Sequence, residues 1–142
     1  MLENSEIRRQ IRLMIAESKR GAEERRARAE SEVRVGKRLL RTVVVPMFKT
    51  VAEALRIEGY AFRVSTPVDS VRISVEGSGE NFIEMIFDSA HDQLALRGRV
   101  SRLRGRQLVV DERIISAGLE LSLLGDEQVL EFLLSELQPF VD

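Results

Sequence analysis

The first 45 residues contain no proline and are rich in Glu, Arg and Ala, a composition that favours an α-helix. We therefore expect a long helix from Ser5 to about Thr42, weakened only at Gly21 and Gly36. One stripe along it has an average step of 3.6 residues, and nine of its eleven positions are apolar or glycine. The stripe comprises Ile11, Ile15, Ser18, Ala22, Arg25, Ala29, Val33, Gly36, Leu40, Val44 and Met47.

This stripe needs a partner surface. Glu–Arg pairs on the opposite face, such as Glu24 with Arg28, stabilise the helix by only about 0.3 kcal/mol each and leave the stripe uncovered. An unbroken helix from Ser5 to Val45 would be about 60 Å long, more than a globular domain formed by the rest of this chain can cover. We therefore predict that residues 1–45 are a helical arm. This arm either pairs with a second copy to give a homodimer, as in a coiled coil, or docks on a helical protein partner. The predicted interface residues are Ile11, Ile15, Ala22, Ala29, Val33, Gly36 and Leu40.

Pro46 follows a β-branched run and disfavours a continuous helix, because proline lacks the backbone donor and restricts the residue before it. The sequence leaves open whether Pro46 kinks one helix or separates two. A helix is expected from Met47 to Glu58, and Gly59 stands where a left-handed C-terminal cap belongs.

After Gly59 the apolar period changes from 3.6 to 2, which indicates β-strands. The alternation predicts strands at 60–65, 71–75, 82–88 and 94–100, a return strand at 108–111 and a last strand at 119–123. We expect a hairpin loop at 77–81, a bulge at Gly98 and a hairpin tip at 104–106. The segment 112–118 fits neither pattern.

A C-terminal helix is expected to begin at Asp126 as its N-cap and to end at Pro139. Its broad apolar face should pack on the sheet. We therefore predict an α+β fold: a long N-terminal helix kinked or broken near Pro46, an antiparallel meander of about four to six strands, and a C-terminal helix on the sheet. Residues 46–142 form the α+β domain in this prediction.

Composition excludes several kinds of chemistry. The 142 residues include no Cys and one His, which excludes a disulfide framework, a thiol nucleophile, a Cys-based zinc site and a cluster of imidazole ligands within one chain. No apolar run approaches the roughly 18 residues of a membrane span, and no basic stretch followed by an apolar one opens the chain. We expect a cytoplasmic protein without a membrane contact.

Three local patterns resemble catalytic or ligand sites. His91 with Asp92 offers a base and its orienting carboxylate, but a solvated turn explains this pair better. Neighbouring carboxylates such as Asp111 and Glu112 are expected by chance in a chain with 23 acidic residues. The glycines at 77 and 79 resemble a phosphate loop, yet no helix follows them. We therefore expect no enzyme, cofactor or metal.

An arginine-rich segment supports a different function. Arg97, Arg99, Arg102, Arg104 and Arg106 fall within ten residues that contain no acid. Arginine forks match phosphate oxygens, so this hairpin could contact nucleic acid. The alternative is that these arginines occupy outward strand positions and protect a sheet edge, in a chain with 19 Arg and three Lys.

The net charge of −1 hides a segregation of charge. Residues 1–60 hold 14 Lys and Arg against 9 Asp and Glu, whereas residues 61–142 hold 8 against 14. We therefore expect a non-enzymatic interaction module, such as an adaptor, a chaperone-like subunit or a structural subunit, that self-associates or docks through its N-terminal helix. The alternative function is nucleic-acid binding by the arginine hairpin. A third interpretation, a small-molecule pocket, would be lined by Phe48, Phe62, Met85, Phe87 and Phe132, but core packing explains these residues better.

Overall fold

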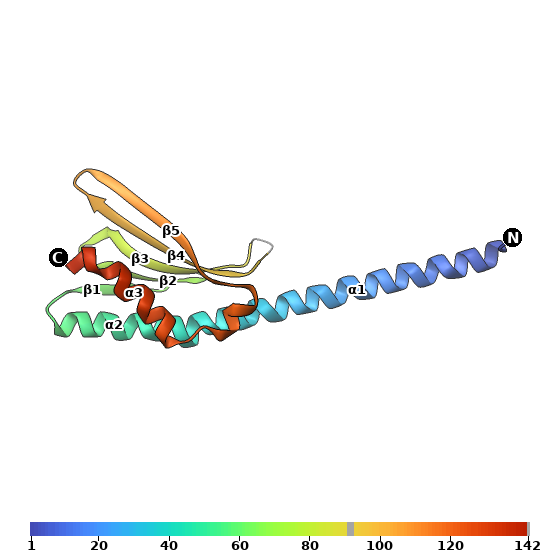
Figure 1. Ribbon diagram of the computed structural model, residues 1–142, viewed down its shortest axis with the longest axis horizontal. Coiled ribbons are helices and arrows are strands. Elements are labelled where there is room, and N and C mark those ends of the chain that lie inside the picture. The colour runs from blue at the N-terminus through green and yellow to red at the C-terminus, as the bar shows by residue number, and fades with distance from the viewer. Residues whose placement is uncertain (91–92, 142) are drawn as a thin grey trace. The chain divides into compact units, whose positions relative to one another are not determined.

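The computed structural model describes residues 1–90 and 93–141, and the chain divides into two compact units, residues 1–34 and 35–142. The first unit holds most of helix α1 (Asn4–Leu39). The second unit begins with the end of α1 and carries all other elements (Figure 1). These are a π-helical turn η1 (Leu40–Val44), α2 (Val45–Ile57), β1 (Phe62–Ser65), β2 (Ser70–Val75), β3 (Ser78–Asp88), β4 (Ala95–Arg104), β5 (Gln107–Ala117), a 3₁₀ helix η2 (Gly118–Leu123) and α3 (Asp126–Val141).

Pro46 does not separate two helices, because the chain stays helical through the π turn. The N–H of Val45 donates to the carbonyl of Leu40, five residues back, and Pro46 follows in the first turn of α2, where its missing N–H is tolerated. Helix α2 ends at Ile57, one residue before the predicted Glu58, and Gly59, with a φ of 95°, is the left-handed cap residue that was predicted. The N–H of Tyr60 reaches the carbonyl of Leu55 at 2.8 Å, the hydrogen bond of a Schellman cap.

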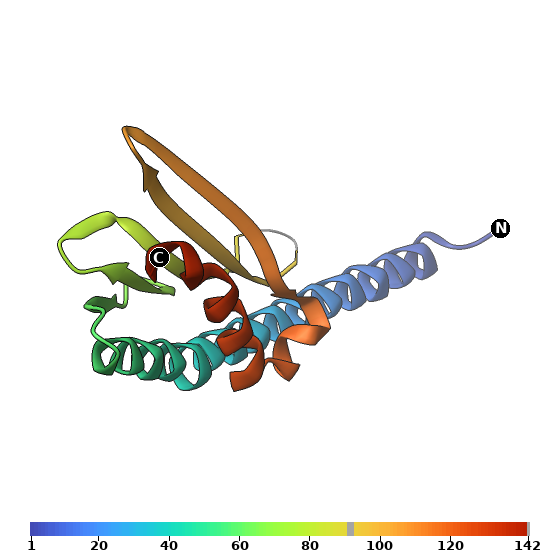
Figure 2. The same ribbon diagram turned by 60° about the vertical axis from the view of Figure 1, so that its left-hand side comes forward.

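The five strands form one antiparallel meander in the order β1-β2-β3-β4-β5, which confirms the predicted α+β fold. Helices α2 and α3 pack on one face of this sheet (Figures 1 and 2). The core between sheet and helices is built from side chains that are at most 1% exposed. They include Val44, Phe48, Val71, Ile73, Ile83, Met85, Val129 and Leu133.

The prediction of a last strand at 119–123 is wrong. Strand β5 continues through the ambiguous segment to Ala117, and Gly118, with a φ of 59°, then turns the chain into the 3₁₀ helix η2. In η2 the side chain of Leu121 is buried, whereas Leu119 and Leu123 point outward. Residues three apart share a face of a 3₁₀ helix, so Leu121 and Leu124 are buried together, and the alternation of leucines at 119, 121 and 123 does not mark one face.

The ends of α3 also differ from the prediction. Gly125, not Asp126, is the capping residue, and its N–H donates to Oε1 of Gln128 at 3.0 Å. Pro139 does not end the helix, which continues to Val141, because a proline in the last turn costs few helical hydrogen bonds.

The turn before β3 is shorter than the loop predicted at 77–81, since β3 already begins at Ser78. Gly98 is not a bulge residue either. The register shift lies between Leu96 and Arg97, and the extra residue is Ile115 on β5. Gly98 is instead a point of close approach, where a Cβ would lie 2.6 Å from Cζ of Phe132.

Candidate interaction surfaces

The first unit is a helix whose apolar side chains contact no other element of that unit. Ile7, Ile11, Met14 and Ile15 are between 40% and 59% exposed, and their spacing of three and four residues places them on one face. Only Ile11 and Ile15 were predicted as interface residues. Ile7 and Met14 were missed, although the spacing 7, 11, 14 and 18 is the heptad signal that finds them.

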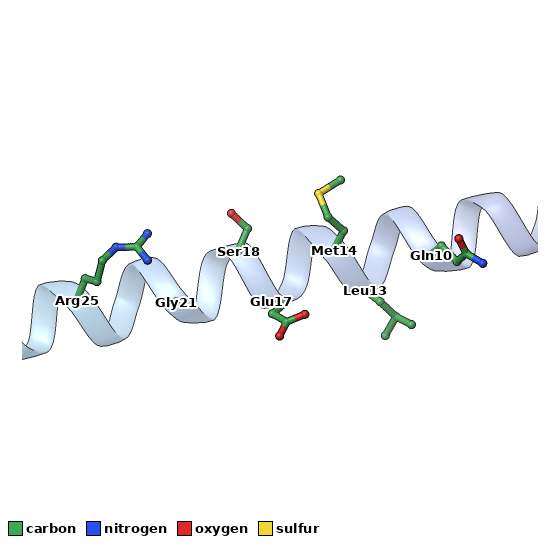
Figure 3. Close-up of a pocket in the computed structure, with 7 residues that line it drawn as sticks. All are labelled: Gln10, Leu13, Met14, Glu17, Ser18, Gly21 and Arg25. Carbon is green, nitrogen blue, oxygen red and sulfur yellow. The ribbon is translucent and has the colours of Figure 1, made fainter.

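Figure 3 shows the segment of α1 from Gln10 to Arg25, where a shallow, open depression lies beside Met14, Ser18 and Gly21. Met14 and Ser18 point to one side of the helix, whereas Leu13 and Glu17 point to the other. The depression arises because residues 18 and 21 have small side chains. It is a surface on which another helix can approach closely, not an enclosed pocket.

The structure divides the seven predicted interface residues between the two units. Ile11, Ile15, Ala22, Ala29 and Val33 lie in the first unit, where Ala22 and Val33 are half-buried and the other three are exposed.

Gly36 and Leu40 lie in the second unit and are core residues there. A Cβ on Gly36 would overlap the ring of Phe87, and Leu40 is only 8% exposed. These two residues are therefore unavailable to a partner. The part of α1 that can receive a partner ends near Val33.

Two of the five arginines proposed to contact nucleic acid are held by carboxylates on the sheet face opposite the helices. Nε of Arg97 donates to Oδ2 of Asp88 at 2.8 Å. Arg99 lies 3.4 Å from an oxygen of Glu112 and 3.9 Å from one of Glu84. The charges of Arg97 and Arg99 are therefore largely satisfied within the sheet.

Glu84 is the centre of this ionic network and is 3% exposed. Its Oε2 accepts from Oγ of Ser70 at 3.2 Å and from Nε of Arg72 at 3.1 Å. The Arg72 guanidinium also lies 3.8 Å from the centroid of the Phe82 ring. The long arginine side chains shield the carboxylate from water, so this network stabilises the sheet face.

Arg102, Arg104 and Arg106 differ from the other two arginines. None of them forms an ion pair with a described residue, and Arg104 and Arg106 are exposed at the end of the β4–β5 hairpin. The structure therefore brings the five arginines onto one hairpin but leaves only three of them free for a partner.

The remaining predicted groups form no site in the described part of the chain. His91 and Asp92 lie outside the described residues. Asp111 is exposed, and Glu112 pairs with Arg99. The five side chains considered as pocket lining are all core residues, none more than 4% exposed: Phe48, Phe62, Met85, Phe87 and Phe132.

Among residues 1–90 and 93–141, no group of three or more His, Asp or Glu side chains is placed to hold a metal ion. No helix in that same part of the chain is long and apolar enough to cross a bilayer. Comparison with protein-family models, curated proteins and solved structures finds no match to this chain.

Proposed function

We propose that this protein is a non-enzymatic interaction module, an adaptor or a structural subunit of the cytoplasm, that pairs with a second copy through residues 4–34 of α1. The observation that carries this proposal is the exposed stripe of Ile7, Ile11, Met14 and Ile15 on a helix without tertiary contacts in its unit. Isolated helices are marginal in water, and most helical stability in proteins comes from packing an apolar face. A partner that covers this stripe supplies that packing.

The charges beside the stripe favour a second copy as the partner. Residues 1–34 hold nine basic and seven acidic residues, interleaved along the helix. Two copies can therefore place Glu opposite Arg across the contact, whereas a helix with flanks of one sign would repel itself. The small residues Ser18, Gly21 and Ala22 allow close approach of the two backbones. Most of the apolar surface buried in the dimer would come from the helical turns before Ser18, which carry the exposed stripe.

The test compares two variants that introduce the same kind of charge on different faces. Ile11→Asp with Ile15→Asp places carboxylates in the stripe, and Leu13→Asp places one on the other side of α1, where Leu13 is 60% exposed. At about 500 mM salt, where contacts between exposed charges are screened, we expect the wild-type chain to sediment as a dimer at high concentration. The stripe variant should associate at least about a hundredfold more weakly, because a carboxylate in an apolar seam is desolvated without a partner.

Leu13→Asp is the matched control and should associate like the wild-type chain. Sedimentation velocity over a range of concentrations measures all three proteins. A wild-type chain that remains single at about 200 µM would refute self-association, since a contact weaker than that has little function at cellular concentrations. Equal weakening by Leu13→Asp and by the stripe variant would move the contact away from the stripe.

A further inference from the structure

The end of the β4–β5 hairpin extends beyond the rest of the sheet. Strand β3 pairs with β4 only from Ala95 to Ser101, whereas β4 and β5 continue to pair as far as Arg104 and Gln107. Figures 1 and 2 both show this hairpin extending past its neighbours. We call residues 102–110 the hairpin tip.

The hairpin tip is amphipathic. Leu103 and Leu108 form a cross-strand pair, are 41% and 51% exposed, and share one face with Val110, which is 51% exposed. Arg102 and Arg104 alternate with Leu103 and so lie on the other face. A partner for this tip must therefore offer apolar surface and negative charge together.

The chain carries a surface of that kind at the other end of β5. Leu119 is 92% exposed and Leu123 is 77% exposed, values that are high for leucine in a folded unit. The exposed carboxylates of Glu120, Asp126 and Glu127 lie within four residues of them. We call these five residues the leucine corner.

Charge is segregated between these two surfaces. Residues 93–110 hold five arginines and no acid, whereas residues 114–142 hold six acids and no base. Neither the three arginines of the tip nor the three carboxylates of the corner form an ion pair with a described residue. The surfaces are therefore complementary in charge, and both are free.

The tip of one chain cannot reach its own leucine corner. Strand β5 spans the 11 residues Gln107–Ala117 between them. At about 3.3 Å per residue the two surfaces lie roughly 30 Å apart at opposite ends of one strand. Their complementarity can be used only between molecules.

We propose that the hairpin tip of one copy binds the leucine corner of a second copy. Such a contact covers Leu103 and Leu108 with Leu119 and Leu123. The long, flexible side chains of the tip arginines reach the carboxylates from the turn and around the edges of the hairpin. This contact does not depend on the pairing of α1. Because the two surfaces differ, the contact is head-to-tail, and a head-to-tail contact that does not close into a ring grows into chains.

A nucleic acid fits the tip less well than a second copy. Phosphates would pair with the three free arginines but would leave the exposed Leu103–Leu108 pair uncovered. Residues 61–142, which contain the tip, hold six more acids than bases, so the body around it repels a polyanion. The same excess of acid attracts the arginine tip of another copy.

The contact should be weak and sensitive to salt. A tip of nine residues is smaller than the 20–30 residues a side of a stable interface. Its charges are exposed, so salt screens them. Neutralising the three arginines should weaken association by about tenfold, the effect expected for three exposed ion pairs.

The experiment mixes two full-length variants, both carrying Ile11→Asp and Ile15→Asp so that α1 pairing does not contribute. The tip variant adds Arg102→Gln, Arg104→Gln and Arg106→Gln. The corner variant adds Leu119→Ser and Leu123→Ser, which change only highly exposed side chains and should leave folding intact. Sedimentation velocity at about 50 mM salt, where exposed charges are weakly screened, measures each variant alone, the mixture and their shared parent.

We expect the parent to form a series of oligomers that grows with concentration and disappears at about 500 mM salt. Each variant alone should sediment mainly as a monomer. Their mixture should form a 1:1 complex and nothing larger, because only one intact tip and one intact corner remain. If each variant has the same thermal unfolding temperature as the parent, both variants are folded.

Three results would overturn the proposal. The first is a parent that stays monomeric at about 200 µM in low salt. The second is a mixture that associates no more than its separate components while the parent does associate. The third is a monomeric parent that binds a 20-nucleotide DNA or RNA duplex through the three tip arginines, which would assign the tip to nucleic acid instead. A failure of α1 pairing affects none of these outcomes, since the stripe is disrupted in every sample.

Discussion

Gly36→Ala tests where α1 stops being an exposed helix and becomes part of the core. A Cβ at position 36 would overlap Cε2 and Cζ of Phe87 and lie 3.0 Å from its Cδ2. The Phe87 ring is 3% exposed, so it has little room to move aside. Gly36→Ala therefore forces a ring displacement within the second unit.

Whether Gly36→Ala raises or lowers stability depends on two opposing contributions to the free energy of unfolding. Alanine is a better helix former than glycine by about 1 kcal/mol, which favours the substitution. Overpacking a well-packed core typically costs about 1–3 kcal/mol, and here the inserted atom meets a rigid ring rather than the end of a flexible chain. Because the Cβ would overlap two ring carbons, we place the clash at the upper end of this range, about 3 kcal/mol, which leaves a net loss of about 2 kcal/mol in the free energy of unfolding.

Gly21→Ala is the matched control in the same helix, and both variants are compared in a chain that carries Ile11→Asp and Ile15→Asp, so that pairing of α1 does not contribute. A Cβ there meets only Nη1 of Arg25, at 3.4 Å, which is the mobile end of a long side chain. Gly21→Ala should therefore keep the propensity gain of up to about 1 kcal/mol without a clash. The same substitution is thus expected to destabilise the protein at position 36 and not at position 21.

Thermal unfolding followed by circular dichroism measures both variants. A loss of about 2 kcal/mol should lower the Tm of the variant at position 36 by roughly 8–10 °C for a unit of this size. Adding Phe87→Leu to Gly36→Ala makes room for the methyl group, so the double variant should lose less stability than the sum of the two single ones. A Gly36→Ala protein that unfolds at or above the Tm of its parent chain would refute the placement of Gly36 against Phe87.

Two further predictions concern the sheet. Gly98→Ala should lower the free energy of unfolding by about 2 kcal/mol, because its Cβ would lie 2.6 Å from Cζ of Phe132. Chemical denaturation would check this: the midpoint should fall while the m-value stays that of the wild-type protein. Glu84→Gln should lower the free energy of unfolding by about 2 kcal/mol, because it leaves Arg72 and Arg99 without their buried counter-charge. A variant as stable as the wild-type protein in the same denaturation experiment would show that the network contributes nothing.

Much of this fold follows from local sequence patterns. The change of apolar period after Gly59 marks the start of the sheet, and the short turns between strands favour a meander of neighbours. The 3₁₀ helix after Gly118 could not be predicted in this way. Leu119, Leu121 and Leu123 alternate as they would in a strand, and only the packing of Leu121 against the body shows otherwise.

The candidate surfaces were only partly predictable. Ile11 and Ile15 follow from helical spacing, but the burial of Gly36 depends on Phe87, 51 positions later in the chain. The paired state of Arg97 depends likewise on strand register, which places it beside Asp88. Contacts between residues distant in sequence decide these cases, and a periodic pattern contains no information about them.

Hydrogen exchange of the full-length chain tests the central claim about α1 most directly, because it reports on residues 4–34 themselves. If the stripe pairs with a second copy, amide protection in this segment should rise as the protein concentration increases from about 1 to about 200 µM at about 500 mM salt. The protection of the second unit should stay constant, because this salt screens contacts between exposed charges. The same segment should exchange rapidly at every concentration when Ile11 and Ile15 are replaced by Asp. Protection of residues 4–34 that is the same at both concentrations and in both proteins would contradict the proposed self-association.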